Sequence, residues 1–283
     1  MQHFVSGLKR HYYGKGDVIV YRLNRDGRTA AGQSPVFGAS VTMLIYGDAF
    51  WPTYAHGDNT GLIATDSMKN FIQRETMAYP GGDLEGLCRF LGEKFLDRYP
   101  QVEGLQISAD EIPYARLGES VAFAPAGPEH ATCRIELTRG DIVEATSGLK
   151  GFKTVRLGGS AFYGFVRDEY TTLPDLHDRP LHMWLDLEWQ YVAPDLAFND
   201  GRATRRVREI VLDVLRTFES GSIQQVIYQI GTRVLADVPS IGVVDLEANN
   251  RTWDTIAERG AELGVYTDAR PPYGCLGLRL TRE

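Results

Sequence analysis

The stretch LHMWLDLEWQYV, Leu181 to Val192, alternates apolar and polar residues along most of its length. Successive side chains of a β-strand point to opposite faces of a sheet, so this stretch presents a continuous apolar row on one face. The row consists of Met183, Leu185, Leu187 and Trp189. A strand with one apolar and one polar face is typical of an antiparallel sheet that is covered on one side.

The segment that follows predicts the helix that covers this face. In ATRRVREIVLDVLRTF, residues 203 to 218, apolar residues recur at spacings of three and four and form one stripe. A shorter helix is predicted over residues 223 to 235, and strands near residues 241 to 247 and 275 to 280 close the chain. Beyond the first of these strands, Asn249-Asn250-Arg251 predicts a polar turn, because asparagine side chains can bond their own backbone.

The first half of the chain begins with a similar order of elements. Two strands of a long hairpin are predicted over residues 17 to 23 and 36 to 47, with a polar turn between them. A helix then begins near Thr65 or Asp66, and either residue is a plausible N-cap.

A stronger helix follows over residues 83 to 100, where leucines recur at spacings of three and four. Two further strands are predicted from residues 102 and 133, the second with an Arg-Gly-Asp turn. Strand pairs and helix pairs thus occur twice, which predicts two similar domains over residues 1–145 and 146–283. The predicted fold class is α+β, with antiparallel sheets that helices cover on one face.

Composition narrows the class of protein. The chain has 283 residues, 43% of them hydrophobic, which is enough for a large apolar core. Its formal net charge is −7, and no Lys/Arg-rich tract predicts a nucleic-acid or membrane surface. Nucleic acid and membranes are therefore not expected as partners.

The cysteines and the N-terminus indicate the compartment. Cys88, Cys133 and Cys275 are far apart and odd in number, which favours neither a disulfide framework nor a CxxC metal site. The N-terminal residues lack an apolar signal core, and no run approaches the roughly 20 apolar residues of a membrane span. We therefore expect a cytoplasmic protein.

Several common catalytic motifs are absent from the sequence. The six histidines show neither HxH nor HExxH spacing, so the sequence predicts no histidine-built zinc site and no bound metal. Three stretches, beginning at Tyr12, His56 and Phe162, are instead dense in polar functional groups. Taken singly, each has a structural explanation: a solvated Lys15 in a hairpin, a helix cap at Thr65 or Asp66, and a surface pair at Asp178-Arg179.

Taken together, these stretches resemble one family, the urate oxidases (uricases), over nearly the whole chain. Tyr13-Gly14-Lys15 resembles the family's YGK, and GDNTGLIATDSMKN, residues 57–70, resembles its GDN…ATDxxKN segment. GFVRDEYTTLPDLHDR, residues 164–179, is similar to its long GFxRDxYTTLxExxDR segment. Ile223-Gln224 with Tyr228 resembles a (V/L)Q…Y segment, and RPPYG, residues 270–274, is similar to a C-terminal RPYG.

The resemblance implies a fold and a set of ligand contacts. Members of the family are cofactor-independent oxidases built from tandem tunnelling-fold (T-fold) domains that oligomerise into a barrel. In this chain Phe162 would stack on a flat purine ring, while Arg179 and Gln224 would clamp its edges. Leu173 would pack nearby, and the backbone of Ile223 would contact the ring edge.

The resemblance also implies that the site is completed by a second subunit. The partner subunit would bring the threonine and aspartate of the ATD segment, here Thr65 and Asp66, so a homotetramer is expected. The family's proton relay joins the YGK lysine, the ATD threonine and a histidine. Lys15 and Thr65 match the first two.

The relay histidine has no counterpart at the matching position. LEANNRTW, residues 246–253, resembles the family's LPNKH(Y/H)F, which places Asn249 at the asparagine that faces the oxygen site and Arg251 at the histidine. Arginine is always charged and cannot act as a general base, although it offers a fixed cation. No other histidine lies near Arg251 in the sequence. His56 and His177 are the candidates that the fold could bring close to this position in space.

Three functions remain open at this point. The first is a cofactor-free oxidase or hydroxylase that uses O2 on urate or a related purine-like heterocycle, with Lys15, Thr65, Asn249 and Arg251 as its catalytic residues. The second is a protein that keeps the scaffold and binds a purine-like or pteridine-like ligand without turnover. The third is a different T-fold chemistry that uses zinc or an acid/base pair, which the histidine spacing disfavours.

Overall fold

The structure is a computed structural model that describes residues 11–25, 34–251, 253–260, 263–269 and 271–282. The described residues form two compact units. The first comprises Met1–Gly148 and Gln190–Thr204, and the second comprises Leu149–Trp189 and Arg205–Glu283. Compactness alone does not establish a domain, so tandem domains over residues 1–145 and 146–283 stay a prediction.

The first unit is an antiparallel sheet with helices against it. Its strands follow the order β1 (Tyr13–Leu23), β2 (Val36–Tyr46), β3 (Gly104–Glu111) and β6 (His130–Thr138), followed by β7 (Asp141–Arg156), whose first half lies in this unit. The hairpin of β1 and β2, the strand from residue 102 and the Arg-Gly turn before β7 were all predicted from the sequence.

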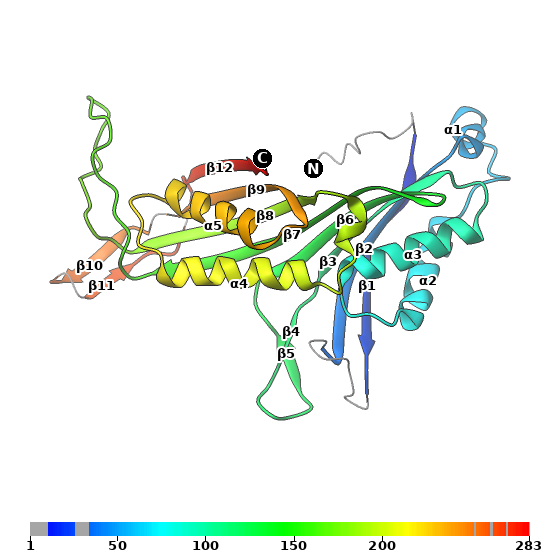
Figure 1. Ribbon diagram of the computed structural model, residues 1–283, viewed down its shortest axis with the longest axis horizontal. Coiled ribbons are helices and arrows are strands. Elements are labelled where there is room, and N and C mark those ends of the chain that lie inside the picture. Colours follow the sequence, from blue (N-terminus) through cyan, green and yellow to red (C-terminus); the bar gives the residue numbers. More distant parts are fainter. Residues whose placement is uncertain (1–10, 26–33, 252, 261–262, 270, 283) are drawn as a thin grey trace. The chain divides into compact units, whose positions relative to one another are not determined.

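Two helices supply the core of this unit, α2 (Thr65–Glu75) and α3 (Leu84–Arg98). Helix α3 packs on β3 and β6, while α2 packs on β1 (Figure 1). The apolar stripe of α3 is fully enclosed, with Leu87, Leu91 and Phe95 all at 0% exposure. Asp83 caps this helix by accepting a hydrogen bond from the Gly86 amide at 2.8 Å.

The start of α2 corrects one expectation. Its N-cap is Ala64, whose side chain makes no capping bond, so neither Thr65 nor Asp66 caps the helix. Both lie in the first turn, and the carboxylate of Asp66 instead accepts hydrogen bonds from Lys69 and Asn70. A first-turn carboxylate is still favoured there by the helix dipole.

Smaller elements of the first unit had no clear periodicity in the sequence. These are η1 (Asp48–Phe50), α1 (Trp51–His56), η2 (Thr76–Ala78), the hairpin of β4 (Tyr114–Arg116) and β5 (Phe123–Pro125), and η3 (Pro194–Ala197). Their strands have three residues each, which is too short for an alternating pattern to emerge.

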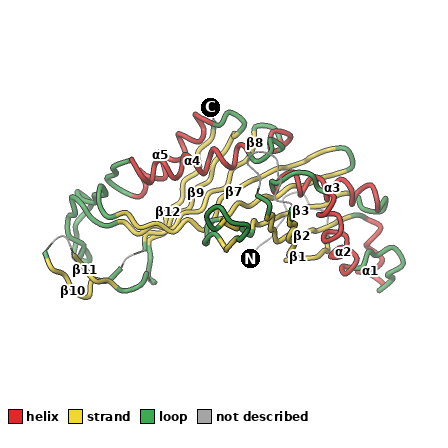
Figure 2. Tube along the Cα trace, turned by 90° about the horizontal axis from the view of Figure 1, so that it is seen from below, coloured by secondary structure: helices red, strands yellow, loops and turns green. Residues whose placement is uncertain are grey.

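The second unit repeats the arrangement of helices on a sheet. The second half of β7 is followed by β8 (Leu181–Tyr191), β9 (Ile241–Asn250) and β12 (Gly274–Thr281). Helices α4 (Arg202–Thr217) and α5 (Ile223–Asp237) lie on one side of these strands (Figure 2). The predicted architecture, antiparallel sheets with helices on one face, is confirmed.

The row of apolar residues in β8 forms the core of the second unit. Met183, Leu185, Leu187 and Trp189 are at most 1% exposed, and they alternate with more exposed residues, as the sequence pattern predicts. Each buried side chain of this size contributes about 1.5 to 3 kcal/mol. An ionisable residue in this row would therefore be strongly destabilising.

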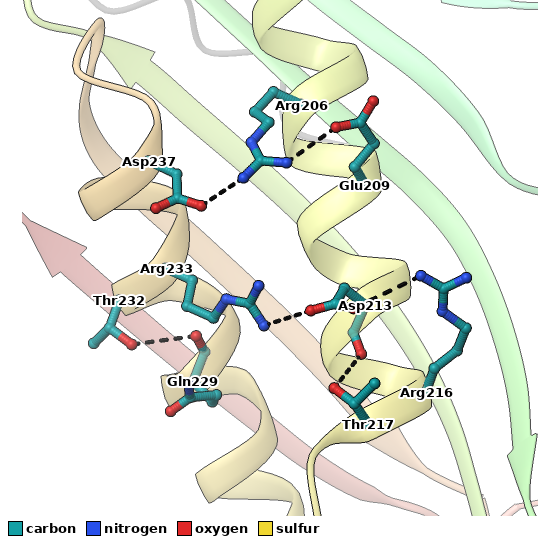
Figure 3. Close-up of polar contacts among 9 residues, drawn as sticks. All are labelled: Arg206, Glu209, Asp213, Arg216, Thr217, Gln229, Thr232, Arg233 and Asp237. Carbon is teal, nitrogen blue, oxygen red and sulfur yellow. Dashed lines mark hydrogen bonds and ion pairs between the residues drawn. The ribbon is translucent and has the colours of Figure 1, made fainter.

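The two helices are linked on their outer side by ion pairs. Arg206 of α4 pairs with Asp237 of α5 at 2.7 Å, and Arg233 of α5 pairs with Asp213 of α4 at 2.8 Å (Figure 3). These side chains are partly exposed, so the ion pairs stabilise the fold little. Most of the stability of this helix layer comes from the buried apolar faces of the helices.

Strand β9 is longer than predicted. It continues through Asn249 and Asn250, which pair with Cys275 and Gly274 of β12, so the predicted turn at the asparagines is wrong. Pairing with a neighbouring strand outweighs the local preference of asparagine for turns. The short hairpin of β10 (Thr255–Arg259) and β11 (Leu263–Tyr266) then follows.

Candidate functional site

A cavity of about 660 Å³ lies in the second unit, where the ends of several elements meet. Its walls come from the segment between β7 and β8, the start of α5, the start of β8, the neighbouring ends of β9 and β12, and the hairpin of β10 and β11. Six residues predicted to bind or react with a ligand line it: Phe162, Leu173, Arg179, Ile223, Gln224 and Arg251.

Backbone hydrogen bonds hold the segment that carries Phe162 and Arg179. Phe162 and Leu176 exchange two such bonds, at 2.7 and 2.9 Å, and the Arg179 amide donates to the Ser160 carbonyl at 2.9 Å. The two ends of the segment are thereby paired like a short ladder. As a result the Arg179 guanidinium carbon lies 5.5 Å from the centre of the Phe162 ring.

The same segment is tied to the start of α5. The Ala161 amide donates to the Ser220 carbonyl at 2.8 Å, and Ser220 lies just before the helix. Ser222 is the N-cap and accepts a bond from the Gln225 amide at 3.2 Å. Ile223 and Gln224 are therefore the first two helical residues, whose amides have no partner within the helix.

Arg179 has no acidic partner within the described part of the chain. Its guanidinium lies over the Phe162 ring, and its Nε is buried without a hydrogen-bond partner. Burial lowers the pKa of this guanidinium from its usual value, but arginine remains charged. A buried donor without an acceptor is costly, so a ligand that accepts hydrogen bonds here would be strongly favoured.

Arg251 follows β9 directly and is held between two aromatic rings. Its guanidinium carbon lies 3.9 Å from the centre of the Trp184 ring and 3.6 Å from that of Tyr273. Its amide donates to the His182 carbonyl at 3.1 Å, and its Nε is buried without a partner. The two rings stabilise the cation while leaving it without a carboxylate among the described residues.

His182 also lines the cavity, and the sequence analysis did not single it out. Its ring stacks on Trp253, with centroids 3.7 Å apart and planes 16° from parallel. Its Nδ1 is buried without a partner, and burial lowers the pKa of the imidazole from its usual value. The alternation in β8 does contain a signal, because it places His182 on the face opposite the buried Met183.

The two histidines suggested from the sequence do not line this cavity. His56 ends α1 in the first unit and is exposed. His177 is exposed and packs on Tyr163, with ring centroids 4.5 Å apart.

The neighbouring asparagines are placed differently from each other. Side chains of successive strand residues point to opposite faces, and Asn250 lines the cavity whereas Asn249 is not among its lining residues. An oxygen-site role for Asn249 therefore stays a prediction. Arg270, the first residue of the RPPYG segment, lies outside the described residues.

The remaining predicted residues lie together in the first unit. Lys15 is in β1, opposite Met43 of β2, and Thr65 and Asp66 begin α2, which packs on β1. The Asp66 carboxylate is stabilised first by Lys69 and also by the positive charge of Lys15, and both lower its pKa. Lys15 and the ATD segment thus form one polar cluster on this unit.

Comparison with known proteins identifies the family. The family model described as "Uricase" matches residues 11–136 and 145–275. The chain belongs to the uricase family.

Curated members of the uricase family show the extent of the likeness. A "Uricase" from Haloferax volcanii is 38% identical over 279 residues, covering 87% of this chain and 89% of that protein. A "Uric acid degradation bifunctional protein" from Bacillus sp. TB-90 is 34% identical and covers 96% of this chain. The chain spans only 60% of that bifunctional protein's length.

Solved uricase structures confirm the T-fold. The crystal structure of a uricase from Bacillus fastidious superposes with a TM-score of 0.86 at 33% identity, covering 96% of this chain and 94% of that one. The urate oxidase of Bacillus sp. TB-90 gives 0.85 at 35% identity, with 96% and 100% covered.

The described residues form neither a metal-binding cluster nor a membrane-spanning helix. They contain no group of three or more His, Cys, Asp or Glu side chains arranged to hold a metal ion. None of the helices found there is long and apolar enough to cross a membrane.

Proposed function

We propose that the protein catalyses the oxidation of urate by O2 without a bound cofactor. The observation that carries this proposal is the cavity of the second unit, where Phe162, Arg179 and Gln224 line one space. An aromatic face, a planar cation and an amide are the groups that a flat ring with amide edges requires.

Each of these side chains has a distinct task in the bound complex. Phe162 stacks on the ring, and the Arg179 guanidinium donates two parallel hydrogen bonds to one edge. The Gln224 amide donates and accepts at another edge, while Leu173 packs against the ring and the Ile223 amide contacts it.

The two arginines of the cavity favour an anionic ring, although Asp178 and Glu258 also belong to its lining. Arg179 and Arg251 line it, and neither has a carboxylate partner among the residues that the structure describes. Two such cations in a partly enclosed site stabilise a deprotonated substrate more than a neutral one. Removal of a proton makes the urate ring electron-rich, which prepares it for direct reaction with O2.

The overall reaction balances with O2 and water alone. The ring loses two electrons and one N–H proton, and water adds its hydroxyl to the ring. O2 takes up both electrons together with the ring proton and the second proton of that water, which gives hydrogen peroxide. The protein therefore has to bind the ring, position it against O2 and water, and transfer protons.

The polar cluster of the first unit completes the proposal. Lys15, Thr65 and Asp66 act at the cavity of a partner subunit, where Lys15 and Thr65 move protons and Asp66 contacts the substrate, with Asn249 at the oxygen site. This requires a homo-oligomer, and we propose a homotetramer in the cytoplasm. The three free cysteines support a reducing compartment.

The test is the loss of urate absorbance in the ultraviolet together with oxygen consumption, measured on protein treated with a chelator. Equal amounts of urate and O2 should be consumed. If neither urate nor a related fused heterocycle causes oxygen uptake, the proposal is wrong.

A second candidate function rests on Arg251, which stands where the resemblance places a proton-relay histidine. A protein that binds urate without turnover would show anaerobic binding but no oxygen uptake. The same two measurements therefore separate a working oxidase from a binding protein.

A further inference from the structure

We propose that His182 is the residue of this cavity that exchanges a proton with the bound ring or its attacking water, while Arg251 acts only as a fixed cation. The inference rests on the proposed function, because it assigns a catalytic residue to that reaction. No other histidine of the described chain lines the cavity.

The pairing of two segments places His182 and Arg251 side by side. The backbone bond from the Arg251 amide to the His182 carbonyl joins the start of β8 to the residue that follows β9. Alternate side chains then stack across this junction, with Arg251 on Trp184 and Trp253 on His182. Both ring planes and the guanidinium are fixed by these contacts, so the imidazole has a defined position in the wall.

The two nitrogens of the imidazole differ in access. Nδ1 is enclosed and has no hydrogen-bond partner, whereas Nε2 is not among the buried unpartnered atoms. Since the side chain lines the cavity, Nε2 is the nitrogen that a ligand or water can reach. Burial lowers the pKa of His182 and so favours the neutral imidazole, which is the form that accepts a proton.

Other titratable groups around the cavity are poorly suited to this task. They are Asp178, Arg179, Arg251, Glu258, Tyr266 and Cys275. Asp178 is occupied by the Gly159 amide at 2.7 Å, and Glu258 lies on an exposed strand. The two arginines cannot accept a proton at physiological pH. A neutral histidine is therefore the group best matched to proton transfer near pH 7.

The decisive variant is His182→Phe, which keeps an aromatic ring against Trp253 but removes both nitrogens. We expect kcat for urate to fall about 10²- to 10⁴-fold, with anaerobic urate affinity changed only a few-fold. The rate of the unmodified protein should fall on the acidic side, below the ordinary histidine pKa of about 6.5, and this acidic limb should disappear in the variant. His182→Gln, which retains a polar side chain, should show the same loss.

His177→Phe is the matched control, because it makes the same change in an exposed histidine that packs on an aromatic ring outside the cavity lining. We expect it to keep both kcat and the acidic limb. Circular dichroism and thermal unfolding establish that each variant is folded. An unchanged kcat and acidic limb in folded His182→Phe or His182→Gln would overturn the inference.

Anaerobic ultraviolet spectroscopy separates this inference from the proposed function. The difference spectrum between bound and free urate reports whether the ring loses a proton in the complex, including a proton that passes to His182 and never reaches the buffer. If the protein binds urate without consuming oxygen, the proposed oxidation fails, and a loss of the ring proton that His182→Phe prevents still supports His182. If in that case bound urate has the same ionisation in His182→Phe as in the unmodified protein, His182 does not take the ring proton and the inference fails. A lack of urate binding overturns both proposals.

Discussion

Two buried polar sites in this protein treat their charged groups in opposite ways. In the first unit, Glu85 is 4% exposed, and its carboxylate accepts hydrogen bonds from Ser147 at 2.6 Å and Thr204 at 3.1 Å. Tyr191 in turn donates to Ser147 at 2.9 Å, so the network is closed. In the second unit, Arg179 and Arg251 each have a buried Nε without any partner.

This difference in hydrogen bonding distinguishes a buried polar group that stabilises the fold from one that binds a ligand. A buried polar group that is fully hydrogen-bonded stabilises one arrangement of the core and has nothing left to offer a ligand. A buried donor without an acceptor destabilises the unliganded protein and becomes satisfied only when a ligand arrives. We therefore expect substitutions at Glu85 to change stability and substitutions at the two arginines to change activity.

The largest effect should follow from Arg179→Gln. Loss of the two charge-assisted hydrogen bonds proposed for the substrate should remove about 3 to 4 kcal/mol, which lowers kcat/KM for urate roughly 10²- to 10³-fold. The free energy of unfolding should stay within about 1 kcal/mol, because no internal hydrogen bond is lost. Steady-state oxygen uptake and urea denaturation measure the two quantities.

Arg216→Gln is the control for this experiment. Arg216 lies on α4 with 72% of its side chain exposed, and it faces Asp213 rather than the cavity (Figure 3). It should leave kcat/KM unchanged. A large drop in the stability of Arg179→Gln would place that arginine with Glu85 as a structural group.

Glu85→Ala should show the reverse pattern. The substitution leaves Ser147 and Thr204 buried without their acceptor and opens a small cavity, which should lower the free energy of unfolding by about 2 to 4 kcal/mol. At a temperature where the variant is folded, KM for urate should not change.

Glu93→Ala on the same helix provides the matched comparison. Its carboxylate is 51% exposed and pairs with Arg89, so its loss should have little effect on the urea midpoint. If both variants unfold at the same urea concentration, the Glu85 network does not stabilise the first unit.

Arg251→Lys should have a smaller effect than Arg179→Gln. Lysine keeps the positive charge but loses the planar contact with Trp184 and Tyr273, a contact worth about 1 to 2 kcal/mol. We expect the anaerobic Kd for urate to rise roughly 5- to 30-fold. Arg279→Lys, at an arginine that is already paired with Asp245, should leave this Kd unchanged.

The sequence predicted the parts of the fold in which periodicity is long. The alternating row of β8 and the apolar stripes of α3 and α4 span 11 to 16 residues, so their period of burial is unmistakable. The hairpins β4–β5 and β10–β11 have strands of three to five residues, and no such pattern can form in them.

The candidate site was predictable only in part. The motif resemblance predicted that Phe162, Arg179 and Gln224 surround one ligand, and these three residues do line one cavity. It did not indicate His182, because the position of that residue depends on the pairing of β8 with a segment about 70 residues away. The turn predicted from the local preference of asparagine was wrong at the end of β9, since pairing with β12 is a non-local effect.

The Glu85 network should also make the stability of the protein depend on pH. Burial raises the pKa of the Glu85 carboxyl above its ordinary value, so the folded protein binds a proton there that the unfolded chain releases. Stability that depends on this proton is fully present below the unfolded value of about 4.3 and is lost as pH rises towards the raised folded pKa. Glu85→Gln, which cannot ionise, should lack this loss.

Urea denaturation of both proteins across this pH range provides the measurement. With rising pH, the unmodified protein should become less stable relative to Glu85→Gln. A difference that stays constant with pH would mean that the Glu85 carboxyl has the same pKa in the folded and unfolded states, because its hydrogen bonds to Ser147 and Thr204 offset burial. A difference of the opposite sign would mean that these hydrogen bonds outweigh burial. In either case the hydrogen bonds around Glu85 would stabilise its charged form. Glu85 would then differ from Arg179 and Arg251 because it has hydrogen-bond partners, and not because it is neutral.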